Sequence, residues 1–219
     1  DAHPLLSERS GIEEHRVHIC RDFTCHTPET TTSGVLNALR SSTSLARSTT
    51  LRRPISGKAT PESTRRRSEQ SFAAESLKAL GDTGLTVTPV SFGAYRIIDE
   101  VETHQQALEE AISSGINLID TSTNYTDGRS ERLIGRVLTK LIKSENLQRD
   151  EIVIVSKIGY LQGQNLQRAQ RRSPSYDDLV EYGDELWHCM HPTFIHEQLT
   201  ESLERLGLGT LDVCLLHNP

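Results

Sequence analysis

From about residue 76 onward, apolar positions recur with the periods of strands and helices in alternation. Stretches that are apolar on both faces, or rich in β-branched residues, predict strands over 84–95, 116–120, 151–157 and 211–217. Apolar residues that return every three or four positions predict helices over 101–115, 130–143 and 193–207. Gly115 and Gly207 end two of these helices, Ser130 is a candidate N-cap, and 158–190 is expected to be a long loop.

The predicted order of elements is β-α-β-α-β-α-β. Alternating units whose strands are apolar on both faces favour a parallel sheet with right-handed crossovers. The sheet could be an open doubly wound one or part of a (β/α)8 TIM barrel. The glycine fingerprint G-x-G-x-x-G of a dinucleotide fold is missing after the first strand, where the sequence reads "SFGAYRI". We therefore expect an α/β barrel, represented here by its first four βα units.

Residues 1–75 have a different character from residues 76–219. The stretch from Thr31 to Arg67 is rich in Arg, Ser and Thr, and Glu62 is its only acid. Such a segment buries too little apolar surface to offset its ordering entropy, so we predict a disordered polar and basic tail over 1–75. An Arg-rich, Ser-rich composition also resembles a mitochondrial transit peptide, but an acidic and mixed segment precedes it. Cytoplasmic localisation is expected, with mitochondrial as the alternative.

The whole chain has 219 residues and a formal net charge of −6, which argues against nucleic-acid binding through bulk electrostatics. No run approaches the roughly 20 apolar residues of a membrane helix, so no membrane association is expected. The four cysteines show no disulfide framework. The sequence begins at Asp1 and ends at Pro219 directly after a strand-like run, and its only methionine is Met190. We expect both ends to be cuts.

Ionisable side chains follow successive strands at the points where the strands end. Asp120 ends the second predicted strand, Lys157 the third and His217 the fourth, and Tyr125 lies in the loop after Asp120. In a barrel, the carboxyl ends of the strands form one rim, where active sites are found. A single polar residue at a strand end is usually a turn former, but four of complementary chemistry predict a site.

Their chemistry suits carbonyl reduction or the reverse oxidation of an alcohol. A phenol is a poor proton donor to a carbonyl at neutral pH, and a nearby ammonium makes its proton easier to lose. Lys157 could supply that ammonium to Tyr125, and Asp120 could hold Lys157 in place. His217 could donate a hydrogen bond to the carbonyl oxygen as negative charge develops.

These residues carry a family resemblance. Residues from about 77 to 219 resemble the aldo-keto reductases through "GINLIDTSTNYTDGRSERLIGRVL", "RDEIVIVSKIG" and "SLERLGLGTLDVCLLHNP", in the right order and spacing. The resemblance implies a (β/α)8 barrel, NADPH bound without a Rossmann fold, and a small carbonyl or alcohol substrate. It also implies a catalytic tetrad of Asp120, Tyr125, Lys157 and His217, with Tyr125 as the general acid.

The resemblance carries a limited set of binding residues onto this chain. The predicted cofactor contacts are Gly93, Ala94, Tyr95 and Asp120, and the predicted substrate contacts are Trp187 and Asn218. In this family, loops after the seventh and eighth strands bind most of the cofactor phosphates, so we expect the chain as given to bind NADPH weakly or not at all. Trp187 is about as readily explained as a packed loop anchor.

No metal site is expected. His18, Cys20, Cys25 and His26 crowd into nine residues, without the two separated ligand pairs of a structural zinc site. The cluster of His188, Cys189 and His191 resembles a ligand set, but the family uses no metal.

Two alternatives to an NADPH-dependent reductase of aldehydes or ketones remain open. One is a non-catalytic barrel that binds the cofactor as a sensor or regulatory subunit. The other is an inactive truncated fragment, because half a barrel leaves sheet edges unpaired. The sequence does not indicate an oligomeric state.

Overall fold

A computed structural model describes residues 20–21, 24–25 and 53–219. The chain divides into two units, 1–51 and 52–219, which are described separately. In the first unit, β1 (Cys20–Arg21) pairs antiparallel with β2 (Thr24–Cys25). The predicted tail up to residue 52 and the zinc candidates His18 and His26 otherwise lie outside the described residues.

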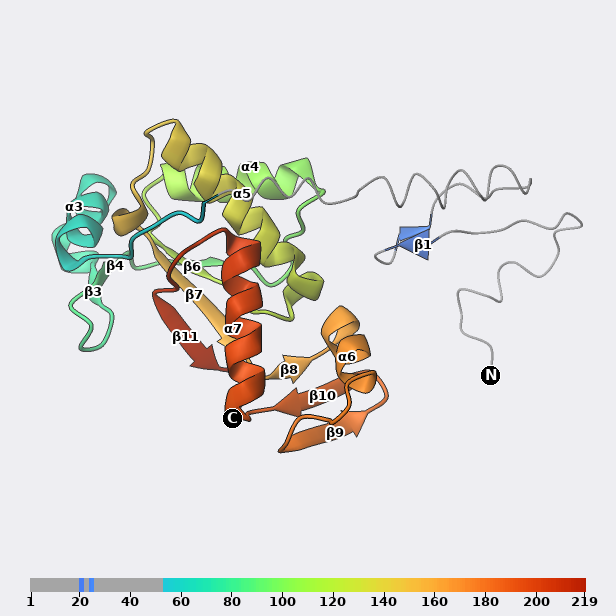
Figure 1. The fold of residues 1–219 in the computed structure, drawn as a ribbon. Coiled ribbons are helices and arrows are strands. Elements are labelled where there is room, and N and C mark those ends of the chain that lie inside the picture. Colours follow the sequence, from blue (N-terminus) through green and yellow to red (C-terminus); the bar gives the residue numbers. More distant parts are fainter. Residues whose placement is uncertain (1–19, 22–23, 26–52) are drawn as a thin grey trace, which may run out of the picture. The chain divides into compact units, whose positions relative to one another are not determined.

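The second unit is built around a parallel sheet of four strands, as the alternating pattern predicts (Figure 1). The strand order is β11-β7-β6-β5, and the strands are β5 (Phe92–Gly93), β6 (Leu118–Asp120), β7 (Val153–Ile158) and β11 (Val213–Leu216). The helices between them are α4 (Glu102–Ser113), α5 (Arg129–Lys143) and α7 (Pro192–Leu206).

The two faces of the sheet bury different partners. Ile119 and Ile154 point to one face and pack with apolar residues of α4, α5 and α7. On the other face, Leu118, Val153 and Val155 pack with a short antiparallel hairpin of β3 (Lys78–Ala79) and β4 (Thr86–Val87). Side chains alternate along a strand, so Asp120 and Lys157 share this second face, beyond the apolar positions that the hairpin covers.

The predicted tail boundary at residue 75 is corrected, because residues 53–75 belong to the folded unit. Ile55 forms a parallel bridge with Leu208, and α3 (Pro61–Ser71) is capped by Thr60, whose hydroxyl accepts a hydrogen bond from the Ser63 amide. The short 3-10 helix η1 (Ala74–Ser76) follows.

Polar contacts, rather than an apolar stripe, hold α3 against the sheet. The fully buried Asn117 side chain donates to the Ser68 hydroxyl and to the Thr86 carbonyl oxygen, and Arg67 donates to the Ile112 carbonyl oxygen at 2.6 Å. Hydrophobic periodicity cannot reveal a helix that is buried in this way, which explains the error at this boundary.

The segment predicted as a long loop contains secondary structure of its own. It holds β8 (Tyr160–Leu161), α6 (Gly163–Gln170), β9 (Leu179–Gly183) and β10 (Leu186–Cys189), and its strands form an antiparallel sheet of order β8-β10-β9. A second apolar cluster fills this region, where Leu161 and Phe194 pack with the partly buried Trp187. We name residues 159–191 the β7–α7 insertion.

Two further expectations differ from the structure. Ser130 is not an N-cap, since α5 starts after Gly128 and the buried Ser130 hydroxyl donates to the Ala94 carbonyl oxygen. The fourth strand is not buried on both faces among the described residues: β11 pairs only with β7, and Leu216 is 51% exposed. No helix in the described ranges is long and apolar enough to cross a membrane.

The buried carboxylate of Asp212 links the N-terminal part of this unit to the sheet. Its removal tests how much this link stabilises the fold. The Asp212 carboxylate accepts from Arg149 at 2.8 Å, from the Ile154 amide and from the Ala59 amide, and its side chain is 2% exposed. Asp212→Ala leaves a buried guanidinium without its partner, so we expect a loss of about 3–5 kcal/mol in the free energy of unfolding.

Urea denaturation measures this loss, with Glu204→Ala as the control. Glu204 is exposed, so its truncation should change the unfolding free energy by less than about 0.5 kcal/mol. Equal effects of the two substitutions would contradict the role assigned to Asp212.

Candidate active site

Lys157 lies at the centre of the predicted tetrad. Its ammonium nitrogen is 2.8 Å from Asp120 Oδ2, 2.8 Å from the Thr121 carbonyl oxygen and 3.2 Å from the Tyr125 hydroxyl oxygen. The Lys157 side chain is only 15% exposed, so these three oxygens take the place of water around its charge. The structure therefore brings Asp120, Lys157 and Tyr125 into one hydrogen-bonded group.

The register of the sheet produces this convergence. Asp120 lies opposite Val155 on β7, and Lys157 lies opposite Leu215 on β11. Lys157 therefore lies two residues beyond Val155, the residue opposite Asp120. His217 likewise lies two residues beyond Leu215, the residue opposite Lys157. This stagger places Lys157 between Asp120 and His217 on the same face.

Tyr125 opens the short 3-10 helix η2 (Tyr125–Gly128) and lies among aromatic and cationic neighbours. Its ring makes an edge contact with the Tyr95 ring at 5.0 Å between centroids, and its centroid is 6.0 Å from that of His217. The Lys157 ammonium is 4.7 Å from the centre of the Tyr125 ring. These contacts fix the ring while its hydroxyl meets Lys157.

His217 follows β11 and is held through both its main chain and its ring. Its amide donates to the Ile158 carbonyl oxygen, and its carbonyl oxygen lies 2.8 Å from His188 Nε2. Its ring Nδ1 is 3.0 Å from the Ser122 hydroxyl. Burial, followed by the positive charge of Lys157 and by His188, lowers the pKa of His217 below its ordinary 6.5.

The predicted cofactor contacts are not equally accessible. Gly93 has open space where a side chain would begin, the Tyr95 side chain is 60% exposed, and the Asp120 side chain is 33% exposed. Ala94 is fully buried, with its amide bonded to the Asp120 carbonyl oxygen and its own carbonyl oxygen bonded to Ser130. Ala94 is thus less accessible than the other three residues, its amide and carbonyl oxygen are already bonded, and its contact with a cofactor stays a prediction.

The predicted substrate contacts lie in different settings. Asn218 follows His217, is exposed, and donates from Nδ2 to the Tyr160 hydroxyl at 2.9 Å. Trp187 is partly buried in the apolar cluster of the insertion, a setting that suits the loop-anchor interpretation.

Sequence reasoning missed three residues that support the site. They are Ser122, whose hydroxyl meets the His217 ring, His188, which meets its carbonyl oxygen, and Tyr160, whose ring makes edge contacts with both histidines. Ser122 stood within the polar run after β6 and could have been inferred from the adjacency of strand ends. The other two belong to the insertion, whose fold the pattern did not reveal.

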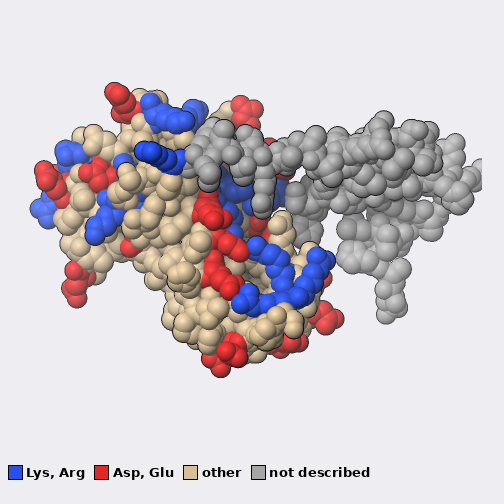
Figure 2. All heavy atoms as spheres, viewed as in Figure 1, with Lys and Arg blue, Asp and Glu red and all other residues tan. Residues whose placement is uncertain are grey.

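The electrostatic surroundings are mixed. Among the described residues, no group of three or more His, Cys, Asp or Glu side chains could hold a metal ion. On the face drawn in Figure 2, basic and acidic side chains are interspersed rather than gathered into one basic area. The ion pairs Arg172–Glu197 and Arg168–Glu201 join the insertion to α7.

Comparison with known proteins identifies the family. A model of the Aldo/keto reductase family matches residues 89–219, which is more than half of the chain. The chain belongs to the aldo/keto reductase family. Its parallel strands are therefore strands of a (β/α)8 barrel, of which this chain contains part.

Individual relatives match over the same region. The NADH-specific methylglyoxal reductase of Escherichia coli strain K12 is 28% identical over 148 residues, which cover 63% of this chain and 40% of that protein. A D-threo-aldose 1-dehydrogenase from a Pseudomonas species is 30% identical over 150 residues, which cover 64% of this chain and 43% of that protein.

Solved structures match similarly. The holo form of an aldo-keto reductase from Bacillus halodurans has a TM-score of 0.49 and 24% identity, covering 64% of this chain and 39% of that one. This aldo/keto reductase chain thus spans about two fifths of the length of these relatives.

The lowered pKa of His217 generates a testable pH dependence. In an NMR titration, we expect the His217 ring to take up its proton below pH 6.5. An unfolded chain binds that proton at a higher pH than the folded protein, so this residue makes the free energy of unfolding fall as the pH drops below 6.5. Lys157→Met removes a neighbouring positive charge and should raise the pKa of His217 from its wild-type value. A ring that titrates at or above 6.5 in the wild type would contradict the assignment.

Proposed function

We propose that this aldo/keto reductase is an NADPH-dependent oxidoreductase that reduces aldehydes or ketones to alcohols. The observation that carries the proposal is the position of the Lys157 ammonium, 2.8 Å from the Asp120 carboxylate and 3.2 Å from the Tyr125 hydroxyl oxygen. A phenol, a partly buried ammonium and a carboxylate at strand ends form an acid-base unit suited to donating a proton to a carbonyl oxygen. The names of the Escherichia coli and Pseudomonas relatives support a small carbonyl or sugar substrate.

In this proposal, Tyr125 is the proton donor. Its hydroxyl gives its proton to the substrate oxygen, and the Lys157 ammonium stabilises the phenolate that remains. Asp120 accepts a hydrogen bond from Lys157, which keeps the ammonium charged and aimed at the phenol. The Thr121 carbonyl oxygen is the third partner of the ammonium and restricts its position further.

His217 orients the substrate oxygen, and the Ser122 hydroxyl contacts its ring at Nδ1. The Ser122 hydroxyl has one hydrogen and lies within reach of His217 Nδ1, Asn124 Oδ1 and the Lys157 carbonyl oxygen. When Ser122 donates to Nδ1, the neutral ring carries its hydrogen on Nε2, and this nitrogen can donate to the carbonyl oxygen. The lowered pKa of His217 favours a neutral ring over a protonated one.

Reduction requires a hydride, which NADPH supplies to the carbonyl carbon when it is bound. The residues present fit the reactive end of such a cofactor, because the open position at Gly93 lets a flat ring approach the backbone and the exposed Tyr95 offers a stacking face. Asp120 lies beside them at the end of β6. Our preference for NADPH over NADH follows the family resemblance, and the Escherichia coli relative is named NADH-specific.

Tyr125→Phe, made in a protein with the complete barrel, tests the proton donor. The substitution removes one oxygen and keeps the ring, so packing and cofactor affinity should change little. Turnover of a small aldehyde such as methylglyoxal should fall by about 10²–10⁴-fold, the usual contribution of general acid catalysis. Steady-state kinetics with NADPH and with NADH measure turnover, and quenching of protein fluorescence measures cofactor affinity.

Lys157→Met is the companion variant, and it should also lower turnover because it removes the ammonium beside the phenol.

Retention of more than roughly a tenth of wild-type turnover by Tyr125→Phe would exclude Tyr125 as the donor. Cofactor binding by the wild type without turnover of any aldehyde or ketone would favour a regulatory barrel instead.

A further inference from the structure

The loop that carries Tyr125 has an unusual backbone. Thr126, Asp127 and Gly128 all have positive φ angles, of 48°, 57° and 76° respectively. Glycine adopts this left-handed conformation readily, whereas a β-branched residue such as Thr126 rarely does. The neighbours of this loop must therefore hold it in place, because its own preferences oppose the conformation.

Side chains on both sides of Tyr125 are bonded to the start of α6 in the β7–α7 insertion. Asn124 Nδ2 donates to Gln162 Oε1 at 2.7 Å. Asp127 Oδ1 accepts a hydrogen bond from the Gln164 amide at 3.0 Å. Thr126 bonds to other parts of the fold, because its hydroxyl oxygen accepts from the Ser130 amide of α5 at 3.1 Å and its hydroxyl donates to the Ile97 carbonyl oxygen at 3.0 Å.

The α6 helix lacks a cap of its own, and Asp127 provides one. Gln162, the residue at its N-cap position, makes no side-chain capping bond, and no acidic residue stands in its first turn. The Asp127 carboxylate accepts from a first-turn amide and places negative charge at the positive end of the helix. Contact at Gly163 is close, because a Cβ there would lie 2.5 Å from Asp127 Oδ1.

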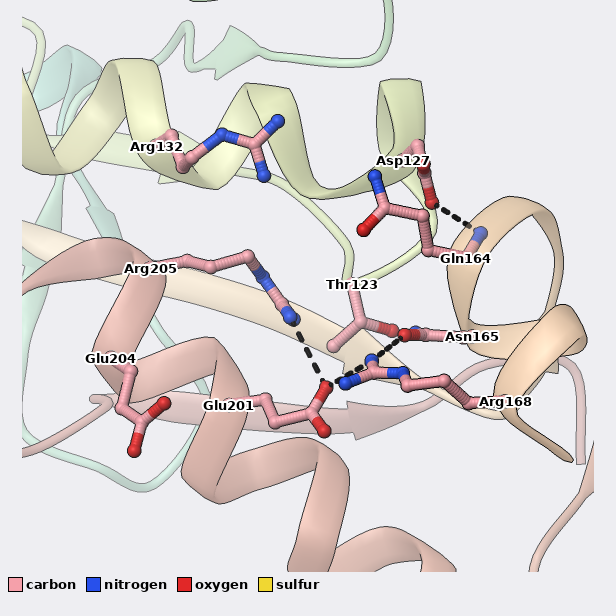
Figure 3. Close-up of a pocket in the computed structure, with 9 residues that line it drawn as sticks. All are labelled: Thr123, Asp127, Arg132, Gln164, Asn165, Arg168, Glu201, Glu204 and Arg205. Carbon is pink, nitrogen blue, oxygen red and sulfur yellow. Dashed lines mark hydrogen bonds and ion pairs between the residues drawn. The ribbon is translucent and has the colours of Figure 1, made fainter. Parts of the chain in front are cut away.

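A polar cavity lies beside this contact between α6 and the loop. The cavity measures about 160 Å³ and is lined by side chains of the loop, α6 and α7, including Thr123, Arg168 and Arg205 (Figure 3). In Figure 3 the bond from Gln164 to Asp127 lies at the edge of this space. The position of the loop relative to α6 is therefore set by a few polar contacts rather than by close apolar packing.

We propose that Asp127 is a positioning residue for Tyr125, through which the β7–α7 insertion holds the tyrosine against Lys157. This inference rests on the proposed function for its effect on turnover. When the bond between Asp127 and Gln164 is lost, the strained turn relaxes and the phenol moves from its place beside Lys157. A displacement of about 1 Å at a reacting group can cost about 10²-fold in rate.

Asp127→Gly and Asp127→Asn separate this bond from the backbone conformation. Glycine tolerates a positive φ better than aspartate but has no side-chain acceptor, whereas asparagine tolerates it and keeps the acceptor oxygen. We expect Asp127→Gly to lower kcat by about 10–100-fold, with cofactor affinity unchanged. Asp127→Asn should retain most of the activity. Gln164→Ala is the matched control, because it removes a side chain and keeps the amide that donates, so its kcat should equal that of the wild type.

Hydrogen-deuterium exchange of the same proteins gives a readout that does not depend on activity. Amides of residues 126–130 should exchange faster in Asp127→Gly than in the wild type, and the rates in Asp127→Asn and Gln164→Ala should match the wild type. Full kcat in Asp127→Gly, or an equal loss in Asp127→Asn, would overturn the proposal. If the wild type reduces no carbonyl, the proposed function fails, and the exchange rates alone decide whether Asp127 holds the loop. Unchanged exchange rates in Asp127→Gly would then overturn this inference as well.

Discussion

The charge of Lys157 is the constraint on which the site depends. Its ammonium is largely withdrawn from water, and a charge in that position is tolerated only when oxygens replace the lost hydration. Asp120, the Thr121 carbonyl oxygen and Tyr125 do so, each within 3.2 Å. The same contacts that satisfy the charge also aim it at the phenol, so one set of bonds serves both stability and the proposed chemistry.

Such bonds require strands that cannot slip, and buried polar contacts around β7 provide this. Glu131 of α5 is fully buried, and its carboxylate accepts from Ser156 at 2.7 Å and from Arg205 of α7 at 2.6 Å. Ser156 precedes Lys157 and points to the opposite face, so this carboxylate ties two helices to the strand directly behind the ammonium. A one-residue slip of β7 would break this network and also turn Lys157 to the helix side of the sheet.

Segments outside the alternating βα pattern complete the site and the unit. The β7–α7 insertion supplies His188 to the main chain of His217 and, through α6, a partner for Asp127. At the other end of the strands, the β3–β4 hairpin and α3 pack beside the sheet, and Asn117, which precedes β6, bonds to both of them. Asp212 bonds Ala59, which precedes α3, and Ile154 of β7. Both segments attach through apolar packing and through hydrogen bonds, and the hydrogen bonds constrain geometry more strictly than the apolar contacts do.

Sequence by itself determined the parallel α/β architecture and the three helices that cover the sheet. It also determined the strand ends that carry Asp120, Lys157 and His217. It could do so because apolar periodicity and strand alternation are local properties of the chain. Only the tertiary structure decided that residues 53–75 are folded, that Ala94 is buried, and that residues 159–191 form a sheet and a helix. These outcomes depend on bonds between polar residues far apart in the chain, such as Ser68 with Asn117 or Asp127 with Gln164. The sequence does not indicate whether a polar side chain faces water or a buried partner, so only the folded chain distinguishes the two.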